Sequence, residues 1–203
     1  MATTPLFHTH TALVEGLRDL LRQLDNRLSL RDPIRVYLAG GMAVHLYTSV
    51  RVTADVDAEF GGRIFLPPDL MVEVTLEDGV RQVIYLDTNY NSTFALMHED
   101  YLDDSLPVDL GLEHFHVHVL SPVDLAVSKI ARFADNDKED IAALVRLGLT
   151  DADAIERRAN GALAGYVGGQ ALLRLNLQEA VDLARRVEYE RRARMRPGGA
   201  TAP

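Results

Sequence analysis

The stretch from Val36 to Glu59 constrains the fold of this 203-residue chain more than any other. It reads VYLAGGMAVHLYTSVRVTADVDAE, which predicts a hydrophobic strand over 34–38, a Gly40-Gly41 turn, a short helix over 42–48 and a second strand over 51–59. Side chains alternate between the two faces of a strand. One face of the second strand therefore carries the polar residues Arg51, Thr53, Asp55, Asp57 and Glu59.

Asp55 and Asp57 would lie side by side on that strand, roughly 6.5–7 Å apart at the backbone. This arrangement needs an explanation, because aspartate is rare in strands and like charges repel. A hard divalent cation would compensate the charge. The Gly40-Gly41 pair allows backbone to approach a ligand closely, and the N-terminus of the following helix attracts phosphate. The alternative is that the polar residues form the solvent-facing side of an antiparallel strand.

The order of hydrophobic strand, Gly-Gly, spacer and Asp-hydrophobic-Asp resembles the nucleotidyltransferase superfamily, whose founding fold is the polymerase-β palm. The fuller string LAGGMAVHLY…RVTADVDAEF is similar to bacterial nucleotidyltransferase-like proteins of the abortive-infection toxin type. The resemblance implies that Gly40 and Gly41 hold the triphosphate of an NTP and that Asp55 and Asp57 hold Mg²⁺ (or Mn²⁺). The superfamily commonly has Gly-Ser at this turn, so a hydroxyl contact to phosphate is absent at position 41.

A second stretch, LSPVDLAVSKIARFADNDKEDIAAL, resembles the helical pair that follows the core in the same group. The resemblance implies that Lys129 contacts the triphosphate or the reacting oxygen and that Asp140 orients the site. The composition supports a specific role for Lys129, since the chain has only two lysines but 19 arginines. We expect further nucleotide contacts from Arg51, Thr53 and Arg132. The alternative for Lys129 is an ordinary charged helix flank.

The superfamily often uses a third carboxylate from a later strand, and Asp87 near the end of a predicted strand over 81–91 suits that role as general base. Glu59, Glu73 and Asp109 compete with it, and Asp87 could equally cap a turn at Asn89. A predicted strand over 113–120 places three histidines on one face: His114, His116 and His118. These histidines either bind zinc or copper or form a neutral exposed face.

These patterns predict an α+β fold, with a nucleotidyltransferase-like mixed sheet flanked by helices. Residues 1–120 would hold an N-terminal helix over 9–30 and the core, and 121–196 a helical region. We expect 197–203 to be a disordered tail. Within this scheme 70–76 fits helix or strand, 93–97 is a further strand, a helix over about 121–134 starts at Ser121-Pro122, and the last helix runs from Asn176 to about Met195.

Composition narrows the functional classes. The chain has no cysteine, which excludes disulfides, thiolate metal sites and cysteine nucleophiles. It has no apolar run of membrane-spanning length and no signal-peptide pattern, so we expect a cytoplasmic protein without membrane partners. A net charge of −9 argues against broad attraction to nucleic acid, although arginines gather near the C-terminus.

The sequence therefore favours metal-dependent transfer of a nucleoside monophosphate from an NTP to a hydroxyl of RNA, protein or a small molecule. The resemblance also implies a role as the toxin of a toxin–antitoxin pair, with a cognate antitoxin as partner. The alternative function is a catalytically inactive nucleotidyltransferase fold that binds a protein partner.

Overall fold

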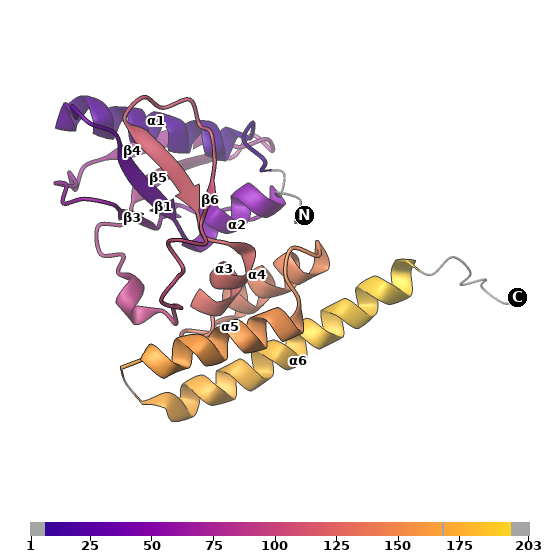
Figure 1. Ribbon diagram of the computed structural model, residues 1–203. Coiled ribbons are helices and arrows are strands. Elements are labelled where there is room, and N and C mark those ends of the chain that lie inside the picture. The colour runs from indigo at the N-terminus through magenta and orange to yellow at the C-terminus, as the bar shows by residue number, and fades with distance from the viewer. Residues whose placement is uncertain (1–6, 168, 196–203) are drawn as a thin grey trace, which may run out of the picture.

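The computed structural model describes residues 7–167 and 169–195, which form an α+β fold (Figure 1). The predicted tail, 197–203, lies outside these ranges. Helix α1 (Ala12–Leu28) begins where Thr11 Oγ1 accepts a hydrogen bond from the Val14 amide, and it ends at Ser29, whose φ is 50°. All of its leucines except Leu28 are buried, and the helix packs against β4 (Met71–Thr75) and β5 (Arg81–Leu86). The predicted helix over 9–30 is confirmed with slightly shorter ends.

The strands form two mixed sheets. In the first, β1 (Ile34–Leu38) pairs in parallel with β7 (Phe115–Val119) and antiparallel with β3 (Ala58–Phe60), and β6 (Leu106–Pro107) lies beyond β7. In the second, β5 lies between β4, which is antiparallel to it, and β2 (Asp55–Val56), which is parallel. The predicted α+β class with mixed strand pairing is confirmed, and the ambiguous segment 70–76 is the strand β4.

The single strand predicted over 51–59 is wrong. The chain leaves the second sheet after β2 and enters the first at β3, so Asp57 lies at the crossing between the two sheets. Residues 51–54 precede the ladder and do not follow the predicted alternation, because Val52 is 47% exposed whereas Thr53 is buried. The alternation holds only from Asp55 onward.

Two strand predictions differ from the structure, because local turn chemistry shortens one predicted strand and replaces the other. The strand predicted over 81–91 ends at Leu86, where Asp87 turns the chain and its Oδ1 accepts a hydrogen bond from the Asn89 amide at 2.8 Å. The segment 93–97 is not a strand. It begins in a 3₁₀ turn, η1 (Ser92–Phe94), which the Asn91 side chain caps by accepting from the Thr93 amide at 2.9 Å.

Several helix boundaries also differ from the prediction. Helix α2 (Gly40–Thr48) includes the glycine pair in its first turn. Helix α3 (Pro122–Ser128) starts at the predicted Ser121 cap but is shorter than predicted, since the chain turns through Phe133 with φ 51° before α4 (Asp135–Arg146). The last helix, α6 (Gln170–Met195), starts before Asn176, whose side-chain amide donates to the Ile130 carbonyl at 3.0 Å.

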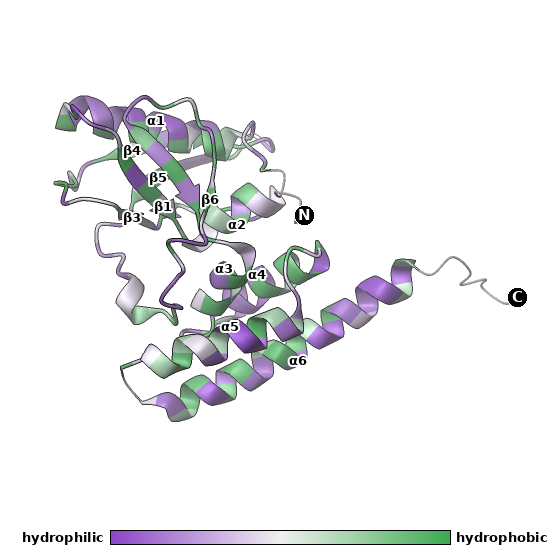
Figure 2. Ribbon diagram, viewed as in Figure 1, coloured by the Kyte–Doolittle hydropathy of each residue, from purple (hydrophilic) through white to green (hydrophobic). Residues whose placement is uncertain are grey.

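Helices α3 to α6 pack together below the sheets, with α5 (Ala152–Gly165) beside α6 (Figure 1). Hydrophobic and hydrophilic residues alternate along α6 (Figure 2), and its buried positions recur three and four apart: Leu173, Leu177, Ala180, Val181, Ala184 and Val187. Among the helices that the structure describes, none combines the length and apolar character needed to cross a membrane.

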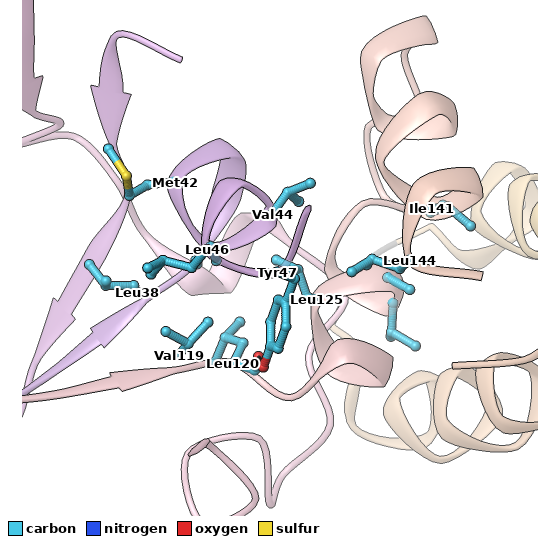
Figure 3. Close-up of a cluster of buried hydrophobic side chains, with 14 of the residues drawn as sticks. Leu38, Met42, Val44, Leu46, Tyr47, Val119, Leu120, Leu125, Ile141 and Leu144 are labelled. Atoms are coloured by element: carbon cyan, nitrogen blue, oxygen red, sulfur yellow. Dashed lines mark hydrogen bonds between the residues drawn. The ribbon is translucent and has the colours of Figure 1, made fainter. Parts of the chain in front are cut away.

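Helix α2 connects the sheets to the helical region. Tyr47 packs in a buried cluster with residues of β1, α3 and α4 (Figure 3), and its hydroxyl donates to the Leu120 carbonyl at 2.8 Å. Buried side chains from both parts of the chain form one continuous core. The division at residue 121 into two domains stays a prediction.

Candidate active site

The glycine pair lets β1 and α2 approach the aspartate segment closely. Gly40 has φ 58°, and a Cβ there would overlap the Asp57 carboxylate. A Cβ at Gly41 would lie 2.7 Å from Thr53 Oγ1. The Ala39 amide also donates to the Asp57 carbonyl at 2.9 Å. Both positions therefore require glycine because the aspartate segment occupies the adjacent space.

Three aspartates gather at the carboxyl ends of two neighbouring strands. In the parallel ladder, Asp55 pairs with Tyr85 and Val56 with Leu86. The next residue of each strand is an aspartate, Asp57 and Asp87, and the Asp87 amide donates to the Val56 carbonyl at 3.1 Å. Asp55 lies two residues earlier and accepts a short hydrogen bond from the Thr53 hydroxyl. Parallel pairing thus brings together carboxylates that are 30 residues apart in the sequence.

These three aspartates line a pocket of about 280 Å³. Within the described part of the chain, none of them forms a salt bridge, so we call Asp55, Asp57 and Asp87 the open carboxylates. Burial, followed by the charges of Asp55 and Asp87, raises the pKa of Asp57 to about 6, although Lys129 and Arg132 oppose the shift. The pocket therefore holds negative charge that no cationic side chain among the described residues contacts directly.

The opposite condition holds for Asp137 and Asp140 of α4, which we call the paired carboxylates. Lys129 Nζ lies 2.8 Å from Asp140 Oδ2 and 3.7 Å from Asp137 Oδ1, and all three side chains are almost fully buried. Arg132 binds Asp137 through two hydrogen bonds of 2.7 Å. Arg51 Nε lies 3.2 Å from Asp140 Oδ1. Each paired carboxylate is thus held between two cationic side chains.

The pKa of Asp137 reflects this environment. Burial favours the neutral form, but hydrogen bonds from Arg132 and the Ala134 amide, together with the charge of Lys129, outweigh it and lower the pKa. The bond from Asp137 to the Ala134 amide, at 3.0 Å, also satisfies the start of α4. Asp137 therefore both starts the helix and positions Arg132.

The pocket brings together most of the predicted site residues: Gly40, Asp55, Asp57, Asp87, Lys129 and Arg132. The other predicted residues do not line it. Gly41 is buried against Thr53, and Thr53 acts on the site through its bond to Asp55. Arg51 reaches Asp140 from outside the pocket. Asp87 caps the turn at Asn89, as considered from the sequence, and it also lines the pocket, while its role as general base stays a prediction.

The three histidines do not form a common site. His114 precedes β7 and its ring lies 3.0 Å from the Asp25 carboxylate, whereas His118 Nδ1 contacts Ser105 Oγ at 3.1 Å and His116 is exposed. Across residues 7–167 and 169–195, no group of three or more His, Cys, Asp or Glu side chains is arranged to hold a metal ion. A cation at Asp55 and Asp57 would therefore need ligands from a substrate or water.

Sequence reasoning missed the part of the pocket wall that follows Asp87. Asn89, Tyr90, Asn91, Phe94 and Ala95 line the pocket together with the carboxylates. The signal was present in the run DTNYN, whose Asp and Asn residues favour turns. A turn at the carboxyl end of the strand that carries Asp87 places these residues at the same edge of the sheet.

Comparison with known proteins gives one match. The model of the family described as "Nucleotidyltransferase of unknown function (DUF6036)" matches residues 15–191, a range that includes every residue of the pocket. No curated protein and no solved structure matches the chain.

Proposed function

The chain belongs to this family of nucleotidyltransferases of unknown function, and we propose that it moves a nucleoside monophosphate from an NTP to a hydroxyl acceptor at this pocket. One observation supports this most directly. The open carboxylates form no salt bridge with any described residue, whereas Lys129 and Arg132, which line the same pocket, are held in place by the paired carboxylates. A metal–nucleotide complex matches both walls, because its cation suits carboxylates and its phosphates suit ammonium and guanidinium groups.

Asp55 and Asp57 fit Mg²⁺ or Mn²⁺. Both are hard oxygen ligands, and the pKa of Asp57 is raised first by burial and then by the charges of Asp55 and Asp87, both of which a bound cation would offset. Mg²⁺ is usually bound by one or two carboxylates, with phosphate oxygens and water completing its shell. Two protein carboxylates are therefore enough. When bound, the ion would neutralise charge on the phosphates.

The basic side chains are suited to the rest of the triphosphate. Lys129 supplies a compact ammonium whose position is fixed by Asp137 and Asp140. Arg132 uses Nε and Nη2 to bind Asp137, while its side chain stays 67% exposed and keeps further N–H donors for phosphate oxygens. Positioned positive charge of this kind supplies most of the catalysis in phosphoryl-type transfer.

Asp87 is our candidate for the general base. In the proposed reaction the acceptor oxygen attacks the α-phosphorus, its proton passes to the Asp87 carboxylate, and the bond to the β-phosphate oxygen breaks to release pyrophosphate. Asp87 Oδ1 accepts a hydrogen bond from the Asn89 amide at 2.8 Å, which holds the carboxylate in the pocket wall where a general base is needed.

Label transfer tests this proposal. The wild type is incubated with Mg²⁺ and each α-labelled NTP, in the presence of RNA, protein or an aminoglycoside as acceptor. We expect transfer to one acceptor class, and a loss of about 10³-fold or more in the Asp55→Asn/Asp57→Asn variant, since metal-ion charge stabilisation contributes several kcal/mol. Asp103→Asn, at an exposed aspartate outside the pocket, is the matched control and should leave transfer unchanged.

Binding provides a readout that needs no acceptor. Electron paramagnetic resonance of Mn²⁺ should show a site in the wild type and in Asp103→Asn, strengthened by NTP and absent from the double variant. Equal Mn²⁺ and NTP binding by the wild type and the double variant would contradict the proposal. That result would favour an inactive nucleotidyltransferase fold that binds a partner.

A further inference from the structure

A larger groove adjoins the candidate active site. It measures about 930 Å³ and lies between the segment that contains η1 and the C-terminal half of α5. Phe94 and Ala95 line both the groove and the active-site pocket, so the two spaces meet at these residues. A Cβ at Gly161 of α5 would lie 2.8 Å from the His98 ring, so the missing side chain lets the loop pack closely on the helix.

The volumes of the pocket and the groove indicate that they hold different parts of one ligand. Pockets for small molecules usually measure about 300–1,000 Å³. The active-site pocket, at about 280 Å³, is below this range, whereas the groove is near its upper end. If the pocket holds the phosphates, the base and ribose of an NTP must extend beyond it. Another adjoining space, about 180 Å³ beside Tyr90 and Asn91, is smaller, and the acidic residue Glu59 is part of its lining.

Phe94 stands at the junction with its side chain free for a ligand. The residue is 79% exposed, although a phenylalanine normally gains by burial. Its backbone is held in the capped turn, where Asn91 Oδ1 accepts from both the amide and the hydroxyl of Thr93. Tyr101 in the groove wall is fixed as well, because its hydroxyl donates to Glu59 Oε2 at 2.7 Å. The exposed ring therefore belongs to an ordered wall.

The charge of the groove restricts what it can hold. Among the described residues that line it, Glu99 is the one charged side chain. A groove without lysine or arginine does not suit the phosphodiester backbone of a nucleic acid, which binds basic surfaces. It does suit an uncharged, flat group with hydrogen-bonding edges, and the hydroxyls of Ser92, Thr93 and Tyr101 supply polar partners.

We infer that this groove binds the nucleoside half of the NTP, with the base stacked on Phe94. The inference rests on the proposed function, since it takes the phosphates to lie in the adjoining pocket. Stacking on an aromatic ring tolerates every base, because every base has a π-face. Purines, which offer the larger face, should bind more tightly than pyrimidines.

Binding measurements separate the nucleoside from the phosphates. Calorimetry with Mg²⁺ compares ATP with tripolyphosphate for the wild type, Phe94→Ala and Phe65→Ala. Phe65 is the matched control, because it is 74% exposed and lies outside the groove. We expect Phe94→Ala to lose about tenfold or more in ATP affinity and nothing in tripolyphosphate affinity. Phe65→Ala should leave both unchanged.

A fluorescence measurement tests the contact itself. The chain has no tryptophan, so Phe94→Trp and Phe65→Trp each introduce a single reporter. We expect Mg²⁺ with ATP to quench Phe94→Trp emission and Mg²⁺ with tripolyphosphate to leave it nearly unchanged. Phe65→Trp should respond to neither.

The two proposals fail in different ways. If tripolyphosphate binds but Phe94→Ala keeps full ATP affinity, the nucleoside lies elsewhere and this inference is overturned, while the phosphate site stands. If the wild type binds neither ATP nor tripolyphosphate, the proposed function falls and the groove inference falls with it. Equal ATP losses in Phe94→Ala and Phe65→Ala would also overturn the inference, because the effect would not be specific to the groove.

Discussion

The open carboxylates line the pocket, and the paired carboxylates hold its basic residues Lys129 and Arg132. Within the described part of the chain, the paired carboxylates form salt bridges and the open carboxylates do not. Asp57 has a pKa raised to about 6 by burial and by Asp55 and Asp87. Asp137 has a lowered pKa because hydrogen bonds and the Lys129 charge outweigh its burial. The same residue type therefore stabilises the fold on one side and strains it on the other. Unrelieved charge of the first kind is typical of functional sites.

The paired carboxylates also explain how Lys129, one of two lysines in the chain, can be buried. Lys129 is acceptable inside the protein because Asp137 and Asp140 compensate its charge, and Arg51 and Arg132 balance the two aspartates in turn. The network fixes the ammonium before any ligand arrives. Substitutions in the paired carboxylates and in the open carboxylates should therefore change the stability of the fold in opposite directions.

The largest effect is expected on the paired side. Asp140→Asn removes the charge that faces Lys129 and Arg51, and it leaves the buried Lys129 with the longer, 3.7 Å contact to Asp137, which Arg132 shares. We expect the free energy of unfolding to fall by about 3–5 kcal/mol in urea denaturation. Asp103→Asn should change it by less than about 0.5 kcal/mol. A loss below about 1 kcal/mol in Asp140→Asn would mean that the two sides do not differ as described.

The same acid-to-amide change in an open carboxylate, Asp57→Asn, should raise the free energy of unfolding instead of lowering it. Well below pH 4, Asp57 is largely protonated in both the folded and the unfolded state. Between about pH 4 and 6 the unfolded state ionises first, so folding loses stability, and above about pH 6 the full penalty remains. Asp57→Asn should therefore stabilise the metal-free protein by about 1–3 kcal/mol at pH 7–8.

Urea denaturation across pH 4–8 measures this difference. The gain in Asp57→Asn should be smallest at pH 4, grow as pH rises toward 6 and level off above about 6. Mg²⁺ with ATP should raise the stability of the wild type and leave the variant unchanged. A variant that is less stable than the wild type at pH 8 would show that the Asp57 charge is compensated after all.

The smallest effect on stability is expected at Arg132, which binds the paired carboxylate Asp137 and lines the pocket with the open carboxylates. Arg132→Lys keeps the positive charge but loses the paired hydrogen bonds to Asp137. Because the side chain is 67% exposed, stability should change by less than about 1 kcal/mol. The transfer rate should fall about tenfold, since the guanidinium is no longer oriented. An unchanged rate would assign Arg132 to the structure alone.

Much of this architecture could be predicted from local patterns. The leucine spacing of α1, the apolar run of β1 and the Ser121-Pro122 start of α3 each depend on residues within a few positions of one another. The glycine pair, the two aspartates and Lys129 were likewise recognisable from residue type and order. Patterns of this kind report helix or strand period and the chemistry that a ligand needs.

Tertiary structure decided which of these residues meet. Regular alternation over 51–59 indicated one strand, but pairing with β1 and β5 divides it between two sheets at Asp57. Arg51 has the residue type of a phosphate contact, and yet it binds Asp140, 89 positions away in the chain. The groove beside Phe94 likewise depends on α5 packing against a distant turn. Local sequence determined the elements and the candidate chemistry. Long-range packing decided their partners, because burial and charge compensation depend on neighbours in space.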